Sequence, residues 1–137
     1  MQEIYQPGDK RRTAYLPGQA TAGNADEWPV FVADKALTIT GVKWVPAAAV
    51  TGDNTNYFSI AAQNKGAAGA GTTAVTATKA YTTGVNSVAF DAEDLTLSST
   101  AADLNMAAGD VLTLKRTVTA SGLAQPDGLV EVTYKYR

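Results

Sequence analysis

Residue types with catalytic chemistry are scarce in this chain of 137 residues. It contains no His and no Cys, which excludes a Ser-His-Asp triad, a cysteine nucleophile and a zinc site with the usual ligands. No lysine pair or carboxylate pair stands out as a nucleophile with its base. The sequence therefore predicts a protein that is not an enzyme, with no catalytic residue, no cofactor and no metal site.

Two oxygen-rich segments carry the ligand type that Ca²⁺ prefers. Asp91, Glu93 and Asp94 form an acidic cluster, and the loop at residues 52–56 has the sequence GDNTN. The loop lacks the twelve-residue spacing and the final Glu of an EF-hand. Turn formation and capping are the preferred interpretation of both segments, with calcium binding as the alternative.

A glycine-rich segment, GAAGAG at residues 66–71, has the composition of a phosphate-binding loop. Such a loop leads from a strand into a helix. Residues 72–81, however, contain four Thr, one Val and one Tyr, residue types that favour strands. We therefore expect a flexible hairpin loop here.

Three consecutive cations, Lys10, Arg11 and Arg12, lie between two tyrosines, Tyr5 and Tyr15. Nucleic-acid sites need more positive charge than this. A solvated arm is therefore the preferred interpretation, with salt bridges to a partner protein as the more specific alternative. Apolar residues nearby, and a tryptophan that precedes a proline, could add contact area. The candidate partner-binding residues are Tyr5, Lys10, Arg11, Arg12, Tyr15, Leu16 and Trp28.

The overall charge limits the classes of partner. Eleven basic residues against 13 acidic ones give a net charge of -2, whereas nucleic-acid binders are usually basic. No apolar run approaches the ~20 residues that span a bilayer, and the polar N-terminus does not resemble a signal peptide. We expect neither nucleic acid nor a membrane as a partner.

The elements that must position these residues follow a two-residue period. From residue 29 onward, short apolar and polar alternations are separated by turn-forming segments, as in an antiparallel sandwich or barrel. The alternation shifts by one residue at Gly41, which predicts a β-bulge. Trp44 falls on the core face, and Arg116 is an exception on the otherwise apolar face that holds Leu112 and Leu114.

Residues 1–28 differ from the rest of the chain. They are rich in turn dipeptides such as Pro7-Gly8 and Pro17-Gly18 and show no sustained apolar period. We expect an extended N-terminal arm at residues 1–28. Residues 29–137 are expected to form a single all-β domain, an antiparallel β-sandwich of about eight short strands with a jelly-roll-like arrangement.

Several short sequence segments in residues 29–136 resemble those of one family of viral proteins. They are Asn64-Lys65-Gly66 before a small-residue loop, Gly84-Val85-Asn86, AAGDVL at residues 107–112 and PDGLV at residues 126–130. The residues of these segments, and their spacing along the chain, resemble those of small head decoration, or cement, proteins of tailed bacteriophages. The resemblance does not extend to residues 1–28.

The resemblance implies a function as well as a fold. A member of this family would be made in the host cytoplasm and would bind the exterior of the virion through the major capsid protein. It would stabilise the shell by bridging neighbouring subunits and would form symmetric homo-oligomers, commonly trimers. The arm, with Tyr5, Tyr15 and the three cations, would lie across a capsid seam.

Two other functions remain open from the sequence. A receptor-binding or carbohydrate-binding module would need exposed aromatic residues on one face, for which Trp28, Tyr57 and Tyr81 are the candidates. A tail or neck structural protein could have the same fold and composition. Neither alternative requires catalytic residues.

Overall fold

The computed structural model describes residues 8–19 and 24–137, and within them nearly all regular structure is strand. One short 3₁₀ helix, η1 (Ala101–Leu104), lies in the segment before β8. The strands are β1 (Lys10–Leu16), β2 (Asp26–Val32), β3 (Leu37–Pro46), β4 (Tyr57–Asn64), β5 (Thr73–Ala74), β6 (Lys79–Ala80), β7 (Glu93–Asp94), β8 (Asn105–Met106), β9 (Val111–Thr119) and β10 (Gly128–Tyr136).

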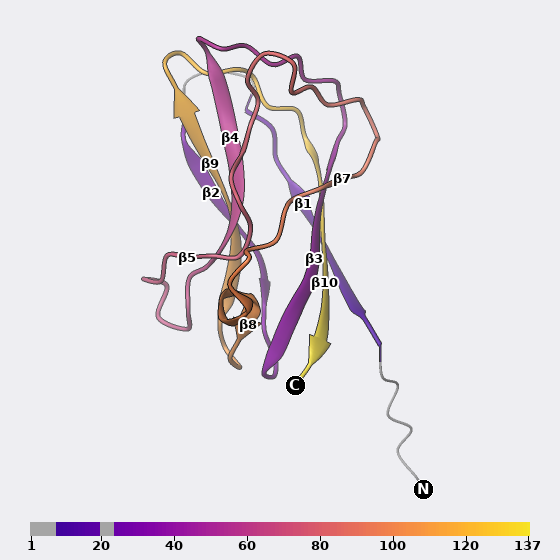
Figure 1. Cartoon of the computed structure of the whole chain (residues 1–137), viewed down its shortest axis with the longest axis vertical. Helices are drawn as coiled ribbons and strands as arrows, with labels where there is room; N and C mark the ends of the chain where they lie inside the picture. Colours follow the sequence, from indigo (N-terminus) through magenta and orange to yellow (C-terminus); the bar gives the residue numbers. More distant parts are fainter. Residues whose placement is uncertain (1–7, 20–23) are drawn as a thin grey trace, which may run out of the picture.

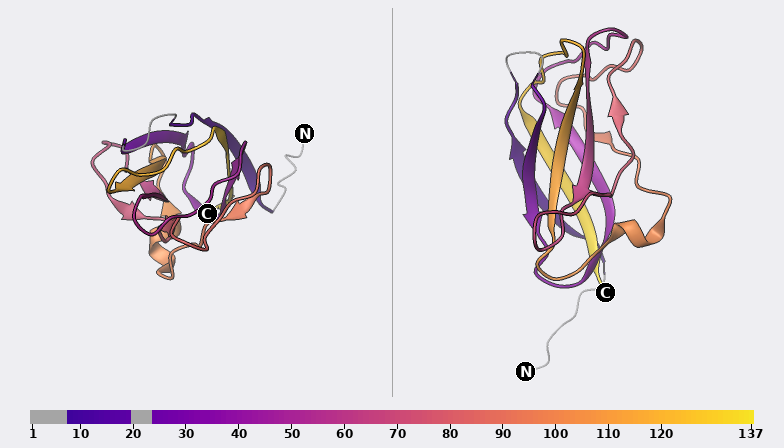
Figure 2. Two further views of the ribbon diagram at one scale, coloured as in Figure 1. Left: turned by 90° about the horizontal axis from the view of Figure 1, so that it is seen from above. Right: turned by 90° about the vertical axis from the view of Figure 1, so that its left-hand side faces the viewer.

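The strands form two antiparallel sheets. Sheet I has the order β1-β10-β3-β7, with β8 also paired to β3. Sheet II has the order β2-β9-β4-β5, with β6 also paired to β4. Figure 1 shows the two sheets as facing layers, and Figure 2 shows the same layers from above and from the side. The expected β-sandwich is confirmed.

The sandwich closes over one hydrophobic core, because alternate residues of both sheets point inward. Trp44 from sheet I and Phe58 from sheet II are both fully buried, which confirms that Trp44 packs in the core. Phe58 packs against Tyr81, with the two ring centroids 4.7 Å apart and the ring planes tilted by 39°. Burial of apolar area at ~25 cal/mol per Å² is the main stabilising term for such a core.

The predicted bulge at Gly41 is confirmed. Thr133 of β10 pairs with Gly41, but the next residue, Tyr134, pairs with Ile39. Thr40 is therefore the extra residue on β3. The bulge lets Ile39 and Val42 both face the core, although they are three residues apart in sequence.

The expectation of an extended N-terminal arm at residues 1–28 needs correction, because parts of this segment belong to the two sheets. Residues 10–16 form β1, which pairs with β10 along all seven positions. Residues 26–28 begin β2, which pairs with β9. The other parts of the expected arm, residues 1–7 and 20–23, lie outside the described residues.

The short strands differ in detail from the sequence-based expectation. The Thr-rich stretch at residues 72–81 forms two separate short strands, β5 and β6, on either side of a single bridge between Thr76 and Leu97. Ser87 forms a single bridge with Val50. The glycine-rich loop joins β4 to β5 as an antiparallel hairpin, as expected.

Candidate interaction surface

Three neighbouring strands bring apolar side chains together on the outer face of sheet I. In the strand register, Tyr15 of β1 lies opposite Leu129 of β10, and Leu129 lies opposite Val45 of β3. The residues that follow Tyr15 and Leu129 are buried in the core. Because strand side chains alternate between faces, Tyr15, Leu129 and Val45 form a row that points to solvent.

Phe90 lies beside this row and is 78% exposed, the most exposed of the large apolar residues in the described structure. Its backbone has φ = 62°, in the left-handed region that bulky residues rarely adopt. Its N–H donates a hydrogen bond to the carbonyl oxygen of Pro46 at 2.7 Å, which holds the loop against the end of β3. A strained backbone that displays a large apolar ring is typical of functional sites.

The row and Phe90 line an open groove of about 350 Å³. We call this surface the Phe90 patch and define it by five residues, Tyr15, Val45, Ala47, Phe90 and Leu129. Contiguous exposed apolar surface usually marks an interaction site in a soluble protein.

A carboxylate borders the patch. Asp127 Oδ1 accepts a hydrogen bond from the Gly18 N–H at 2.5 Å, which ties the end of β1 to the turn before β10. Partial burial raises the pKa of the Tyr15 phenol, and the neighbouring Asp127 charge and hydrogen bond raise it further. Tyr15 therefore stays neutral at physiological pH.

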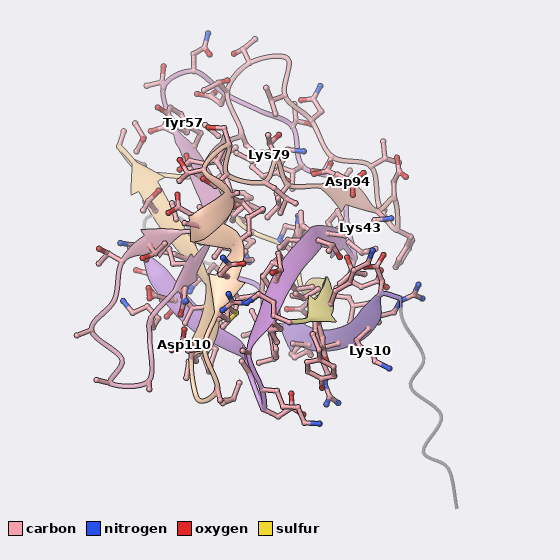
Figure 3. The ribbon with its side chains drawn as sticks, turned by 60° about the horizontal axis from the view of Figure 1, so that its bottom comes forward. Lys10, Lys43, Tyr57, Lys79, Asp94 and Asp110 are labelled. Carbon is pink, nitrogen blue, oxygen red and sulfur yellow. The ribbon has the colours of Figure 1, made fainter. Side chains whose placement is uncertain are left out.

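Beyond the patch, the outer face of sheet I becomes charged. Arg11 lies 3.9 Å from Glu131, with the arginine side chain largely exposed. Lys43 of β3 pairs in register with Asp94 of β7, and Figure 3 shows these two side chains close together on the side of the molecule that carries Lys10. Exposed pairs of this kind contribute little stability, but they place charges of both signs at the edge of the apolar groove.

The sequence-predicted site residues lie in different places. Arg11, Arg12 and Tyr15 are exposed on β1, whereas Lys10 is half-buried. Leu16 is 1% exposed and belongs to the core, so it supports β1 from beneath and offers no contact area. Tyr5 lies outside the described residues.

Trp28 is on the other sheet. It pairs in register with Leu114 and packs half-buried against the core. The structure therefore separates Trp28 from the β1 residues with which it was grouped.

The aromatic face expected for a carbohydrate-binding module does not form as a set. Tyr81 is fully buried, and its hydroxyl lies 3.0 Å from Glu93 Oε2 and 2.9 Å from Ser87 Oγ. Burial raises the pKa of Tyr81 far above its ordinary value. Trp28 and Tyr57 are both half-buried, so no one of the three residues presents an open ring face.

The acidic cluster has a structural role at Glu93. Lys79 Nζ donates to Glu93 Oε2 at 2.5 Å. Burial alone would raise the pKa of Glu93, but the hydrogen bonds from Lys79, Ser87 and Tyr81 outweigh it and hold the pKa below 4.5. Across residues 8–19 and 24–137, no three acidic residues are grouped in a way that could hold a metal ion.

The loop at residues 52–56 forms a turn. Asp53 Oδ1 accepts hydrogen bonds from the N–H groups of Thr55 and Asn56, both at 2.7 Å. These bonds lower the pKa of Asp53. This Asx-type turn is the capping role expected from the sequence. Within the described part of the chain, no helix is long and apolar enough to cross a membrane.

Arg116 is the least expected buried group. It is 0% exposed, and its guanidinium lies 5.1 Å from the centre of the Phe58 ring. One nitrogen, Nη2, donates to the Leu123 carbonyl oxygen at 2.5 Å, while Nε and Nη1 have no hydrogen-bond partner among the described residues. Burial lowers the pKa of Arg116, and Asp26 opposes that effect.

Sequence reasoning did not identify Phe90, Val45 or Leu129 as surface residues. A signal existed for Leu129, because it falls on the same face of β10 as Glu131, Thr133 and Lys135. An apolar residue among polar ones on the solvent face of a strand indicates a contact. Phe90 gives no such signal, since it lies in a loop that has no period.

Comparisons with known proteins add a fold-level likeness only. No protein-family model matches the chain, and no curated protein matches it. Among solved structures, a chain from "Structure of infectious bursal disease virus Gx strain" is similar, with a TM-score of 0.43 and 11% sequence identity. The likeness covers 93% of this chain and 32% of the other, so this chain spans about a third of the length of that one.

Proposed function

We propose that this protein is a non-enzymatic virion structural protein that binds the exterior of a phage capsid. It stabilises the shell by bridging neighbouring subunits of the major capsid protein. The Phe90 patch is the observation that carries this proposal. The resemblance of residues 29–136 to phage head decoration proteins supplies the partner.

The patch has the composition of a protein-binding surface. Tyr15 is 68% exposed and Phe90 is 78% exposed, and aromatic residues are enriched among the residues that dominate binding energy. The neighbouring Arg11 and Lys43 are matched by Glu131 and Asp94. A rim with charges of both signs fixes orientation and register more than it adds affinity.

The proposed mechanism is thermodynamic linkage. A protein that binds only the assembled shell stabilises that shell by mass action. When two contact sites are joined in one molecule, the second contact forms at high effective concentration. A β-sandwich that binds two capsid subunits at once can therefore stabilise the shell without any covalent chemistry.

The test is binding to particles that have been stripped of this protein. We expect the wild-type protein to rebind to heads and to raise the temperature at which they break. Phe90→Ser and Leu129→Ser should each lose about tenfold or more in affinity, as expected when a central apolar contact is removed.

A matched control is Val32→Ser. Val32 is also an exposed apolar residue, at 60%, but it lies on β2 in sheet II, away from the Phe90 patch. It should rebind like the wild type. Binding to isolated tails in place of heads, or equal affinity of the Phe90 and Val32 variants, would contradict the proposal.

A further inference from the structure

β1 is an edge strand with one open side. It pairs with β10 from Lys10 to Leu16 and stands at the end of the strand order of sheet I. No other strand in the described residues pairs with its far edge. An edge of this length presents unpaired backbone N–H and C=O groups, and it is a template for another strand.

The sequence of β1 is complementary to itself in the antiparallel direction. When two copies pair with Thr13 opposite Thr13, all seven residues of each strand overlap. Residues directly opposite one another in an antiparallel pair point to the same face. Arg11 of each copy then lies opposite Tyr15 of the other, on the outer face of the joined sheets.

Neighbouring registers are less favourable. Centring the pair on Arg12 places two Arg12 side chains directly opposite each other, and like charges in that position are destabilising. Centring it on Ala14 places Arg11 opposite Pro17, which has no N–H to donate. The Thr13-centred register avoids both problems.

The Thr13-centred register brings Arg11 of each copy against Tyr15 of the other, and both residues are suited to this contact. Arg11 has an exposed side chain that reaches Glu131 only at 3.9 Å, so it is available to lie across a second ring. Tyr15 presents an exposed ring, and Asp127 lies next to it with a negative charge. An arginine over a tyrosine face and close to a carboxylate gains from both interactions.

We propose that two copies of this protein associate by antiparallel pairing of β1 with β1 about Thr13, which joins their two copies of sheet I into one continuous sheet. The contact is isologous, because the same residues contribute from each copy. It uses Tyr15 of the Phe90 patch in the contact and leaves the other four patch residues, Val45, Ala47, Phe90 and Leu129, on the outer face, so a dimer would present two copies of this remaining apolar surface. This inference does not depend on capsid binding.

Exchanging the two contact residues tests the register. Tyr15→Arg places Arg opposite Arg11 at both ends of the interface, and we expect the dissociation constant of the dimer to rise about tenfold or more. The double variant Arg11→Tyr with Tyr15→Arg restores an Arg–Tyr pair at each end, and it should return to within about threefold of the wild type. Sedimentation velocity over a range of protein concentrations measures both values, and circular dichroism checks the fold.

Val32→Arg is the matched control, because it also changes an exposed apolar residue to arginine but lies on sheet II. It should leave the dimer unchanged. Three results would overturn the inference. They are a wild type that stays monomeric, a trimer of the kind implied by the family resemblance, and a dimer that Tyr15→Arg does not weaken.

A disulfide gives a second, independent measurement. The chain contains no cysteine, so Thr13→Cys introduces a single thiol. Opposed residues in an antiparallel pair have Cα atoms ~4.5–5.5 Å apart, within the range that a disulfide spans. Mild oxidation should cross-link this variant into a dimer, whereas Arg11→Cys should not, since the two Arg11 positions lie at opposite ends of the interface. Equal cross-linking of the two variants would refute the register.

Discussion

Replacing Phe90 with Asn separates the strain at this position from the contact that the ring provides. Phe90 has φ = 62°, and an L-residue in this region costs roughly 1–2 kcal/mol relative to its preferred conformations. Asn tolerates the left-handed region better, because its short polar side chain can hydrogen-bond locally. The substitution therefore relieves part of the strain.

The lost burial offsets that gain. With 78% of Phe90 exposed, only about a fifth of its surface is removed from solvent. For a side chain of roughly 200 Å² that fraction is ~40 Å², or ~1 kcal/mol at 25 cal/mol per Å². We expect the free energy of unfolding of Phe90→Asn to lie within ~1 kcal/mol of the wild type.

Urea unfolding followed by tryptophan fluorescence measures this change, with the buried Trp44 as the probe. Phe90→Ala is the matched control, because it loses the same ring and keeps more of the backbone strain. Alanine should be less stable than asparagine by ~0.5–1 kcal/mol, and both should bind stripped capsids weakly. A loss of more than ~2 kcal/mol in Phe90→Asn would show that the ring holds the fold together, and equal stability of the two variants would refute the strain.

Three further changes test the supporting structure. An added methyl in Gly18→Ala would lie 2.5 Å from the carbonyl oxygen of Gln125, so we expect a loss of ~1–3 kcal/mol in urea unfolding. Glu93→Gln should be less stable than the wild type at pH 7, because the charged Glu93 is paired with Lys79. The difference should shrink as the pH falls below 4.5 and through the lowered pKa of folded Glu93. Arg116→Met should unfold with equal or higher free energy, by up to ~4 kcal/mol, because it removes a buried charge with unpaired nitrogens.

Each of these three predictions has a contrary outcome. Wild-type stability in Gly18→Ala would show that the turn before β10 can move aside. If the difference in unfolding free energy between Glu93→Gln and the wild type is the same at pH 3 and pH 7, the loss comes from packing and not from the charge of Glu93. Marked destabilisation of Arg116→Met would show that the guanidinium makes stabilising bonds through water or through residues outside those described.

Alternation in the sequence was a reliable guide where one face of a strand is buried. It predicted β10 and the shift at Gly41, and it marked Arg116 as an exception on an apolar face. The pattern could not reveal that Arg116 is fully buried, since burial of a charge depends on the Leu123 carbonyl and the Phe58 ring that the fold brings to it.

β1 was not predicted because its inward side does not have to be apolar. Arg12 lies on the phase that alternates with Tyr15, yet it remains exposed, because the margin of an edge strand is open to solvent. Only Leu16 at the end of β1 reaches the core. This strand is held by its backbone pairing with β10. Backbone pairing does not require alternating apolar residues, so the sequence KRRTAYL shows no strand period.

The place of β10 between β1 and β3 has a consequence for synthesis on the ribosome. β1 is made early, but its only strand partner in the described structure is β10, which follows almost all of the described chain. β3 can pair with β7 and β8 sooner, but its longest pairing also waits for β10. The bond between Gly18 and Asp127 joins segments 109 residues apart, and contacts between such distant segments form slowly. A nascent chain cannot complete sheet I until β10 has left the exit tunnel, so chains truncated before β10 would lack the paired β1 and the row formed by Tyr15, Leu129 and Val45. The release of β10 from the ribosome is therefore the step that creates this apolar row, and a chain that stops before β10 cannot use that surface.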